Sequence, residues 1–482
     1  MSYIFKNIVF MNFPFYLAGK FQTSETPLFI KSPYNNEIVG QTWLATNDDF
    51  NYAITQAEKA FLETRNMPTH QRAAILNQIA NKLEENSEYF AKLITLESAK
   101  PLKYSLAEVD RTIQTYRIAA EETKRIDNEY FSIDWTEAGT NKEGFIKHFP
   151  LGVIAGISPF NFPLNLTAHK IAPAIATGNT IILKPSSSTP LSILALAKII
   201  DETSLPKGAI SILPTDRKTG NILTNDNRIK KITFTGSPSV GWNIKNSAYK
   251  KRITLELGGN AAAIITPSGF SQETVNKCVS GAFSFSGQVC IHLQRIYVEK
   301  SNYKEFLSLF LKETEKIKIG DPLDKTTDLS AVINYSNKER IENWISEAEK
   351  QGAKKIYYKK QPGNIVNPTI LTNTNKNMRV NYEEIFGPVV CIEQYTEFHN
   401  VINKVNESPF GLQAGIFSDS LSQINKAFNE IEVGGLIVND IPTFRVDHMP
   451  YGGIKNSGFG REGIKYAMKE MLEPKLLIKN TI

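Results

Sequence analysis

From Pro150 onward, short apolar runs alternate with amphipathic segments, and this pattern leaves few folds open to the chain. The runs have the length of strands, and the segments between them have the length of helices of roughly ten to fifteen residues. Strands that alternate with helices form βαβ units, whose strands pair in parallel. The predicted strands are Val153–Ile157, Thr180–Leu183, Ile210–Leu213, Ile232–Phe234 and Ile253–Leu257. The sequence therefore predicts an α/β fold with a parallel sheet.

The same alternation recurs after about Asn260, which predicts a second α/β domain. The predicted strands there are Ala261–Ile265, Ile296–Val298, Val389–Ile392 and Leu436–Val438. A chain of 482 residues exceeds the size of one hydrophobic core, so two or three domains are expected. The flexible pair Gly258-Gly259 marks the predicted boundary. From Asn47 to about Arg125, apolar residues recur at helical spacing.

Two segments are predicted as strands outside the two main sheets. They are Tyr130–His148 and Leu476–Lys479, and they suit a small oligomerisation flap. We therefore expect a homodimer or a homotetramer.

Composition argues against several other classes of protein. No apolar stretch is long enough to cross a bilayer, and the net charge of +6 comes from basic residues that are scattered along the chain. We expect neither a membrane-bound nor a nucleic-acid-binding protein. Cys278, Cys290 and Cys391 are too sparse for a disulfide framework or a metal site, which favours a reducing, cytoplasmic location. Residues 1–10 are interpreted as an ordinary leader and not a signal peptide.

Two segments after predicted strands carry polar groups. In Ser158-Pro159-Phe160-Asn161-Phe162-Pro163 the prolines impose an ordered turn, in which Asn161 either donates to an oxyanion or forms an Asx turn. Lys184 ends another strand, where ligands of open α/β sheets bind, although a solvated lysine is the alternative.

The segment Thr235-Gly236-Ser237-Pro238-Ser239-Val240-Gly241 links a strand to a predicted helix. It lacks the sequence of a P-loop and that of the common dinucleotide fingerprint. Backbone N–H groups at the start of the helix could still hold a pyrophosphate.

Two further residues are candidates for catalysis. Glu256 lies between two leucines, so it is either a general base facing a polar cavity or one half of a buried ion pair. Cys290 follows the glycine turn Ser286-Gly287-Gln288-Val289 and is either a nucleophile or a small core residue.

Taken together and in this order, these segments resemble the aldehyde dehydrogenase superfamily from about Met11 to the C-terminus. The resemblance implies a Rossmann-like cofactor domain (11–127 and 149–258), a catalytic α/β domain (259–450) and an oligomerisation segment (128–148 and 465–482). It also implies an NAD(P)-dependent oxidation of a small aldehyde, with no metal. The pattern is closest to members that act on lactaldehyde, succinate semialdehyde or glyceraldehyde phosphate.

The resemblance assigns a role to each catalytic candidate. Cys290 would attack the aldehyde as a thiolate, Asn161 would stabilise the oxyanion, and Glu256 would activate the water that hydrolyses the thioester. Glu473 resembles a late glutamate linked to water or proton relay. The implied cofactor-binding residues are Ser158, Pro159, Phe160, Lys184, Ser186, Ser187, Phe234, Gly236, Ser237, Gly241, Leu257, Glu384 and Phe386.

Departures from the family pattern bear on specificity. Ser187 stands where many NAD-preferring members have a glutamate, so NADP is expected to be accepted. Arg111 and Arg445 either bind an anionic substrate tail or make structural ion pairs. Phe162, Val289 and His292 are further candidates for the substrate pocket.

Two rival functions stay open at this point. A CoA-acylating enzyme of this fold usually lacks the water-activating glutamate, whereas Glu256 is present. A non-catalytic, structural descendant would have lost its nucleophile or base, whereas Cys290 and Asn161 are both present.

Overall fold

The computed structural model describes residues 11–357 and 361–481. The predicted leader, residues 1–10, lies outside the described residues. In the part that is described, no helix is both long and apolar enough to cross a membrane.

The first α/β unit is built on an eight-stranded sheet in the order β22-β12-β11-β8-β9-β10-β2-β3. Its strands are β2 (Phe15–Leu17), β3 (Lys20–Gln22), β8 (Val153–Ile157), β9 (Thr180–Lys184), β10 (Ile210–Ile212), β11 (Ile229–Thr235), β12 (Arg252–Glu256) and β22 (Gly458–Phe459). β8 to β12 run parallel, and β2, β3 and β22 add antiparallel edges. The five strands predicted for this sheet are confirmed.

Helices bury this sheet, because its central strands are apolar on both faces. They are α1 (Asn47–Thr64), α2 (Thr69–Glu85), α3 (Ser87–Ser98), α4 (Leu102–Thr123), α5 (Pro163–Thr177), α6 (Leu191–Asp201), α7 (Arg217–Gly220), α8 (Ile222–Asn225), α9 (Pro238–Ser247) and α16 (Ile464–Glu470). The predicted helical region from Asn47 to Arg125 thus contains four helices.

The second unit has a seven-stranded sheet in the order β15-β16-β17-β14-β13-β19-β20. Its strands are β13 (Ala261–Ile265), β14 (Leu293–Glu299), β15 (Lys354–Tyr357), β16 (Thr369–Thr372), β17 (Val389–Tyr395), β19 (Gln413–Phe417) and β20 (Gly435–Val438). Its helices are α10 (Gln272–Phe283), α11 (Tyr303–Thr314), α12 (Tyr335–Lys350), α13 (Arg379–Tyr382), α14 (Phe398–Asn406) and α15 (Leu421–Glu430). This unit confirms the predicted second α/β half.

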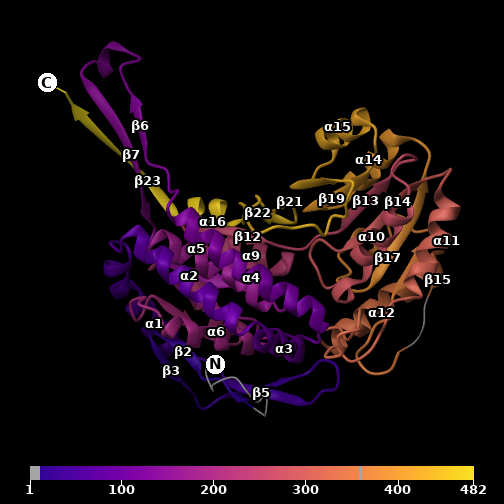
Figure 1. Ribbon diagram of the computed structural model, residues 1–482, viewed down its shortest axis with the longest axis horizontal. Helices are drawn as coiled ribbons and strands as arrows, with labels where there is room; N and C mark the ends of the chain where they lie inside the picture. The colour runs from indigo at the N-terminus through magenta and orange to yellow at the C-terminus, as the bar shows by residue number, and fades with distance from the viewer. Residues whose placement is uncertain (1–10, 358–360, 482) are drawn as a thin grey trace.

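A third, three-stranded antiparallel sheet projects from the first unit (Figure 1). It consists of β6 (Glu129–Ser132), β7 (Lys142–Pro150) and β23 (Leu472–Asn480), and most of β23 is exposed. The two segments predicted as extra strands therefore pair with each other. Smaller sheets join β1 (Met11–Asn12), β4 (Pro27–Lys31) and β5 (Ile38–Trp43), and β18 (Phe410–Gly411) with β21 (Ile454–Lys455).

The sheets change between Glu256, which ends β12, and Ala261, which begins β13. Near the C-terminus, Ile464 and Met468 of α16 join the core of the first unit, and only then does the chain enter β23. The domain boundaries given above stay a prediction.

Candidate active site

The carboxyl ends of three parallel strands lie at one edge of the first sheet. Ile157 of β8 is in register with Lys184 of β9 on one side and with Phe234 of β11 on the other. The strand order runs outward from β8 in both directions, and ligands of open α/β sheets bind outside such a switch point. The segments predicted to bind the cofactor therefore meet at this edge.

The turn after β8 places Asn161 beside the segment that leads to Cys290. The chain leaves β8 at Ile157 and enters α5 at Pro163, as the prolines predict. Asn161 is buried, and its Nδ2 donates to the Gln288 carbonyl oxygen at 3.0 Å. An amide nitrogen carries two hydrogens, so the second can serve another acceptor.

The start of α5 is fixed by a buried ion pair. Glu108 Oε1 accepts hydrogen bonds from Leu164 N at 2.9 Å and Asn165 N at 3.2 Å. The ammonium of Lys100 pairs with the same carboxylate and lies 3.8 Å from the centre of the Phe162 ring. These contacts bind the otherwise unpaired N–H groups of the first helical turn and hold the preceding turn in place.

The segment before Cys290 is a turn with a left-handed backbone. Phe285, Ser286 and Gly287 have φ of 49°, 54° and 68°, which costs energy for residues other than glycine. Ser286 Oγ donates to the Ser330 carbonyl at 2.8 Å, and Gln288 Oε1 accepts from Ile333 N at 2.9 Å. These tertiary bonds keep the turn that presents Cys290.

Gly258-Gly259 lets two functional segments approach each other closely. A Cβ on Gly258 would lie 2.2 Å from Glu384 Oε2, and one on Gly259 would lie 2.1 Å from the Cys290 carbonyl oxygen. Gly259 N also donates to Glu384 Oε1 at 2.8 Å. Burial raises the pKa of Glu384 to about 7. The glycine pair thus brings a predicted cofactor ligand next to Cys290, the predicted nucleophile.

Glu256 is a buried carboxylate without a hydrogen bond. Neither of its carboxylate oxygens has a partner among residues 11–357 and 361–481. Oε1 lies where a side chain on Gly452 would project, at 2.7 Å from the Cβ position. Burial, reinforced by the charge of Glu462, raises the pKa of Glu256 well above its usual value. Glu256 therefore has the basicity and the free oxygens of a general base.

The neighbouring carboxylate, Glu462, has hydrogen-bond partners at one of its two oxygens. Its Oε1 accepts from Lys170 Nζ at 3.0 Å and from Thr235 Oγ1 at 3.3 Å. Although burial favours the neutral form, Lys170, His169 and Arg445 hold the pKa of Glu462 well below its usual range. The two carboxylates therefore have opposite pKa shifts, which is typical of paired acid and base groups.

Cys290 is half-buried and contacts a tyrosine. Its Sγ lies 3.0 Å from the hydroxyl oxygen of Tyr451. Burial raises the pKa of the thiol to about 11, while the Tyr451 hydrogen bond and the charge of Arg445 act in the opposite direction. Cys278 and Cys391 are fully buried, which supports the packing role expected for them.

The start of α9 suits an anionic ligand. A Cβ on Gly236 would lie 2.7 Å from the Phe234 ring, and one on Gly241 would lie 2.3 Å from Leu257. Both glycines therefore allow the helix to approach the sheet closely. Ser237, at the N-cap, makes no capping bond in the described structure, so its side chain does not occupy the first N–H groups. These residues fit the pyrophosphate of a dinucleotide.

Lys184 and Ser187 lie beside the segment that leads into α7. Gly220 approaches the aliphatic chain of Lys184, with a Cβ position 3.0 Å away, and burial lowers the lysine's pKa. Ser187 Oγ donates to the Thr215 carbonyl at 3.2 Å, and Ser186 Oγ accepts from Ser188 N. This arrangement leaves a serine, with no negative charge, at the position predicted to discriminate between cofactors.

Two aromatic rings close the edge of the predicted cofactor crevice. The rings of Phe160 and Phe386 meet edge to face, with centroids 5.8 Å apart, and Phe386 has a left-handed φ of 48°. Ser158 is buried and accepts from Thr167 Oγ1 at 3.1 Å, while Pro159 is half-buried. The structure thus brings together turns that are far apart in sequence.

Arg111 makes the ion pair that was one of its two interpretations. Its Nε and Nη2 donate to the Asp447 carboxylate at 3.2 and 2.7 Å. Asp447 also accepts from His169 Nε2 at 2.8 Å and from Asn165 Nδ2 at 3.2 Å. The Arg111 side chain is nevertheless 30% exposed, so its outer nitrogens can meet a ligand.

Arg445 is buried deeper and is only partly paired. Its Nη2 lies 3.5 Å from Glu462 Oε2, and the guanidinium lies 3.6 Å from the centre of the Tyr451 ring. The buried Nε has no hydrogen-bond partner in the described part of the chain. A buried donor without a partner is costly, and an anionic ligand would satisfy it.

The other substrate candidates have different surroundings. Val289 is partly buried in a small apolar cluster with Cys290 and Ile291. Phe162 is half-buried and packs against Phe285, with centroids 6.0 Å apart. His292 is buried, its Nε2 is hydrogen-bonded to the Ala282 carbonyl at 2.8 Å, and burial lowers its pKa to about 4. These contacts favour the packing role of His292.

The prediction for Glu473 is wrong. Its side chain is 57% exposed and pairs with Arg252, outside the cluster around Glu256. The glutamate in that cluster is Glu462, which lies with Lys170, and neither residue was predicted from the sequence. The adjacent pair His169-Lys170 inside an otherwise apolar helix was a signal that could have identified Lys170.

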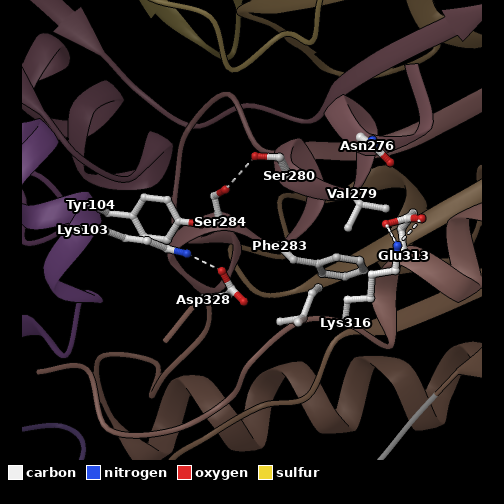
Figure 2. A pocket seen from close by; sticks show the side chains of 11 residues that line it. Lys103, Tyr104, Asn276, Val279, Ser280, Phe283, Ser284, Glu313, Lys316 and Asp328 are labelled. Carbon is white, nitrogen blue, oxygen red and sulfur yellow. Dashed lines mark hydrogen bonds and ion pairs between the residues drawn. The ribbon is translucent and has the colours of Figure 1, made fainter. Parts of the chain in front are cut away.

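A separate hollow of about 320 Å³ lies between α4, α10 and α11 (Figure 2). The cations that line it face anions: Lys103 pairs with Asp328, and Lys316 pairs with Glu313 at 2.7 Å. None of its lining residues was predicted as a site residue.

Comparisons with known proteins give the same family throughout. The sequence profile of the Aldehyde dehydrogenase family matches residues 21–477. The 3-sulfolactaldehyde dehydrogenase of Priestia megaterium is 40% identical over 466 residues, which cover 96% of this chain and 97% of that protein. The lactaldehyde dehydrogenase of Methanococcus aeolicus is 40% identical over 457 residues, 94% of this chain and 97% of that protein.

A solved structure is similar over the whole chain. The crystal structure of aldehyde dehydrogenase 21 from Physcomitrella patens, in complex with the reaction product succinate, matches with a TM-score of 0.97. The two chains are 39% identical, and the match covers 98% of this chain and 99% of that one.

Proposed function

The chain belongs to the aldehyde dehydrogenase family and is an NAD(P)-dependent oxidoreductase that acts on aldehydes, and on this premise we propose that its substrate is a short aldehyde with an anionic tail. The observation that carries the proposal is the buried Nε of Arg445, which has no partner among the described residues. The relatives named for sulfolactaldehyde and the neighbour that holds succinate support it.

Arg111 and Arg445 together would hold the tail. The carboxylates that pair with them, Asp447 and Glu462, keep both guanidinium groups in place. A guanidinium presents several N–H groups in one plane, which matches the oxygens of a carboxylate or a sulfonate. We therefore assign Arg111 to the outer end of the tail and Arg445 to the end nearer the thiol. Val289 and Phe162 would contact the apolar part of the substrate.

The first half of the reaction takes place at Cys290. Its thiol loses a proton, and the thiolate attacks the carbonyl carbon, so that a C–S bond forms and the carbonyl electrons move to oxygen. The free N–H of Asn161 would stabilise that oxyanion. When bound, NAD(P) would supply the acceptor for the hydride that leaves this carbon, and Cys290 would then carry a thioester in place of the hemithioacetal.

The second half is hydrolysis at Glu256. Its carboxylate removes a proton from water, which attacks the thioester, and the C–S bond breaks to release the acid and the thiolate. The two unpaired oxygens of Glu256 support this role, because they leave room for a water molecule. Glu462 and Lys170 would balance the change in charge that occurs when Glu256 gains a proton.

For the cofactor we propose a preference for NADP. Ser187 Oγ donates to the Thr215 carbonyl just before α7, the short helix that carries Arg217 and Lys218. A 2′-phosphate would meet these cations without the repulsion that a glutamate at residue 187 would cause. Glu384 would bind the other ribose of the cofactor.

A panel of short aldehydes with neutral, carboxylate, sulfonate and phosphate tails, run with both cofactors, tests this proposal. We expect an anionic substrate with NADP to give the highest kcat/KM. Arg111→Gln should lower kcat/KM for that substrate about tenfold or more, mainly through KM, and leave neutral aldehydes nearly unaffected. Arg125→Gln, at the exposed end of α4, is the matched control. Equal loss for neutral and anionic substrates would contradict the proposal.

Product analysis with CoA separates the remaining alternative. Free acid as the product in the presence of CoA supports hydrolysis, and an acyl-CoA product would contradict it. We further propose a homo-oligomer that assembles through the exposed β23, and a cytoplasmic location that keeps the three free cysteines reduced.

A further inference from the structure

The phenol of Tyr451 lies against the thiol from a distant part of the chain. The two atoms in contact, Sγ and Oη, belong to residues 161 positions apart. Tyr451 is 2% exposed, and its backbone exchanges two hydrogen bonds with Glu462: Tyr451 N donates to Glu462 O at 3.0 Å, and Glu462 N donates to Tyr451 O at 2.6 Å. The backbone pairing of these two residues therefore fixes both the phenol of Tyr451 and the buried carboxylate of Glu462.

The other side of the contact is a cation over the ring. The guanidinium of Arg445 lies 3.6 Å from the centre of the Tyr451 ring, an attractive cation–π geometry. A cation above the ring draws electron density from it, which makes the phenolic O–H a stronger hydrogen-bond donor. The ring contact with Arg445 does not involve the hydroxyl, so the hydroxyl needs a separate explanation.

The order of ionisation decides which atom donates. Burial raises the pKa of Cys290 to about 11, and it raises the pKa of Tyr451 well above its usual value. A thiol ordinarily ionises before a phenol, at a pKa near 8.5 against about 10. When Cys290 loses its proton, Tyr451 therefore keeps its own. The other charged groups near the thiol are Arg445, which favours the thiolate, and Glu384 and Glu256, which oppose it.

We propose that Tyr451 is a catalytic residue, whose hydroxyl donates a hydrogen bond to the Cys290 thiolate and so increases the amount of nucleophile that is ready to attack. The inference rests on the proposed function, in which Cys290 is the nucleophile. The bond also lowers the intrinsic reactivity of the sulfur, because a more stable thiolate is a weaker nucleophile. With a Brønsted coefficient near 0.45, a tenfold gain in thiolate leaves a net gain of about threefold in rate.

Tyr451→Phe tests the inference, because it removes one oxygen atom and keeps the ring that Arg445 covers. We expect Cys290 to react with iodoacetamide about threefold more slowly at pH 8, with the pH profile displaced to higher pH. Peptide mass spectrometry resolves the three cysteines, and the buried Cys278 and Cys391 are internal references. Tyr303→Phe, which loses a hydroxyl bonded to the Ile392 carbonyl at 3.3 Å, is the matched control.

The outcomes separate the two proposals. If Cys290→Ala still oxidises aldehydes, the proposed function fails. If Cys290→Ala is inactive while Tyr451→Phe alkylates with the rate and pH profile of the wild type, only the inference about Tyr451 fails. Thermal unfolding checks that the variants fold. Tyr451→Met, which fills similar space without a hydroxyl, repeats the test should the phenylalanine variant be unstable.

Discussion

Two buried carboxylates of the candidate site, Glu256 and Asp447, have opposite surroundings. Asp447 accepts four hydrogen bonds, from Arg111, His169 and Asn165. Neither oxygen of Glu256 has a hydrogen-bond partner in the described structure. Although burial favours the neutral form at both sites, the bonds from His169 and Arg111 hold the pKa of Asp447 well below its usual range. The pKa of Glu256 moves upward instead.

The difference shows that a buried carboxylate can either hold its neighbours in place or be available to accept a proton. A carboxylate whose lone pairs are all used fixes its neighbours and has no basicity to offer. An unpaired carboxylate costs stability, and it is retained where it must accept a proton. In the proposed function, Asp447 therefore positions Arg111 and His169, and Glu256 is free to act on water.

The largest effect is expected from Glu256→Gln. Gln keeps the shape but cannot accept the proton of water, so hydrolysis should fall by about two to four orders of magnitude. Cofactor reduction should survive as a single burst, with the thioester detected on Cys290 by intact mass. Glu473→Gln, at the exposed pair with Arg252, should behave as the wild type. Loss of the burst together with turnover would argue that Glu256 acts before the thioester forms.

Asp447→Asn should reduce stability rather than hydrolysis. Removing the charge leaves the partly exposed Arg111 without its anionic partner, at a cost of about 3 kcal/mol. Denaturant unfolding measures this cost. Asp328→Asn, which breaks the half-exposed pair with Lys103 shown in Figure 2, is the control and should cost less than about 1 kcal/mol. Equal losses in the two variants would remove the distinction between the two carboxylates.

The smallest expected effect is the change in the rate of hydrolysis with each unit of pH. Because Glu256 acts as a base, hydrolysis requires its ionised form, and the raised pKa moves the acidic limb well above pH 4.5. Below that pKa the single-turnover rate of thioester hydrolysis should fall about tenfold per pH unit. Attack by Cys290 should rise toward alkaline pH, since burial raises the pKa of its thiol. An acidic limb near pH 4 would contradict the unpaired state of Glu256.

The strands and the catalytic candidates could be predicted because their signals are local. Val153–Ile157 and Ala261–Ile265 were predicted with the bounds that the structure gives, since a strand buried on both faces is a continuous apolar run. Cys290 and Asn161 lie in turns whose glycines and prolines are visible in the sequence, and Glu256 is visible as a charge between two leucines at the end of a strand. The short edge strands β3 and β22 have no such run, and they were missed.

Local signals did not identify which glutamate near the C-terminus belongs to the site. Glu462 and Glu473 lie 11 positions apart, and each lies in a segment that resembles a motif of the family. Packing of α16 against the first unit buries Glu462 beside Lys170, whereas Glu473 begins the exposed strand β23. Burial depends on contacts between distant segments, so the sequence could not choose between the two.

The sequence alone determined the α/β architecture, because periodicity acts over a few residues, and the order of several motifs identified the family and made Cys290 the candidate nucleophile. The tertiary structure decided what surrounds the thiol. Tyr451, Arg445 and Glu256 reach Cys290 from three separate segments, and their pKa shifts arise only after folding removes water from between them.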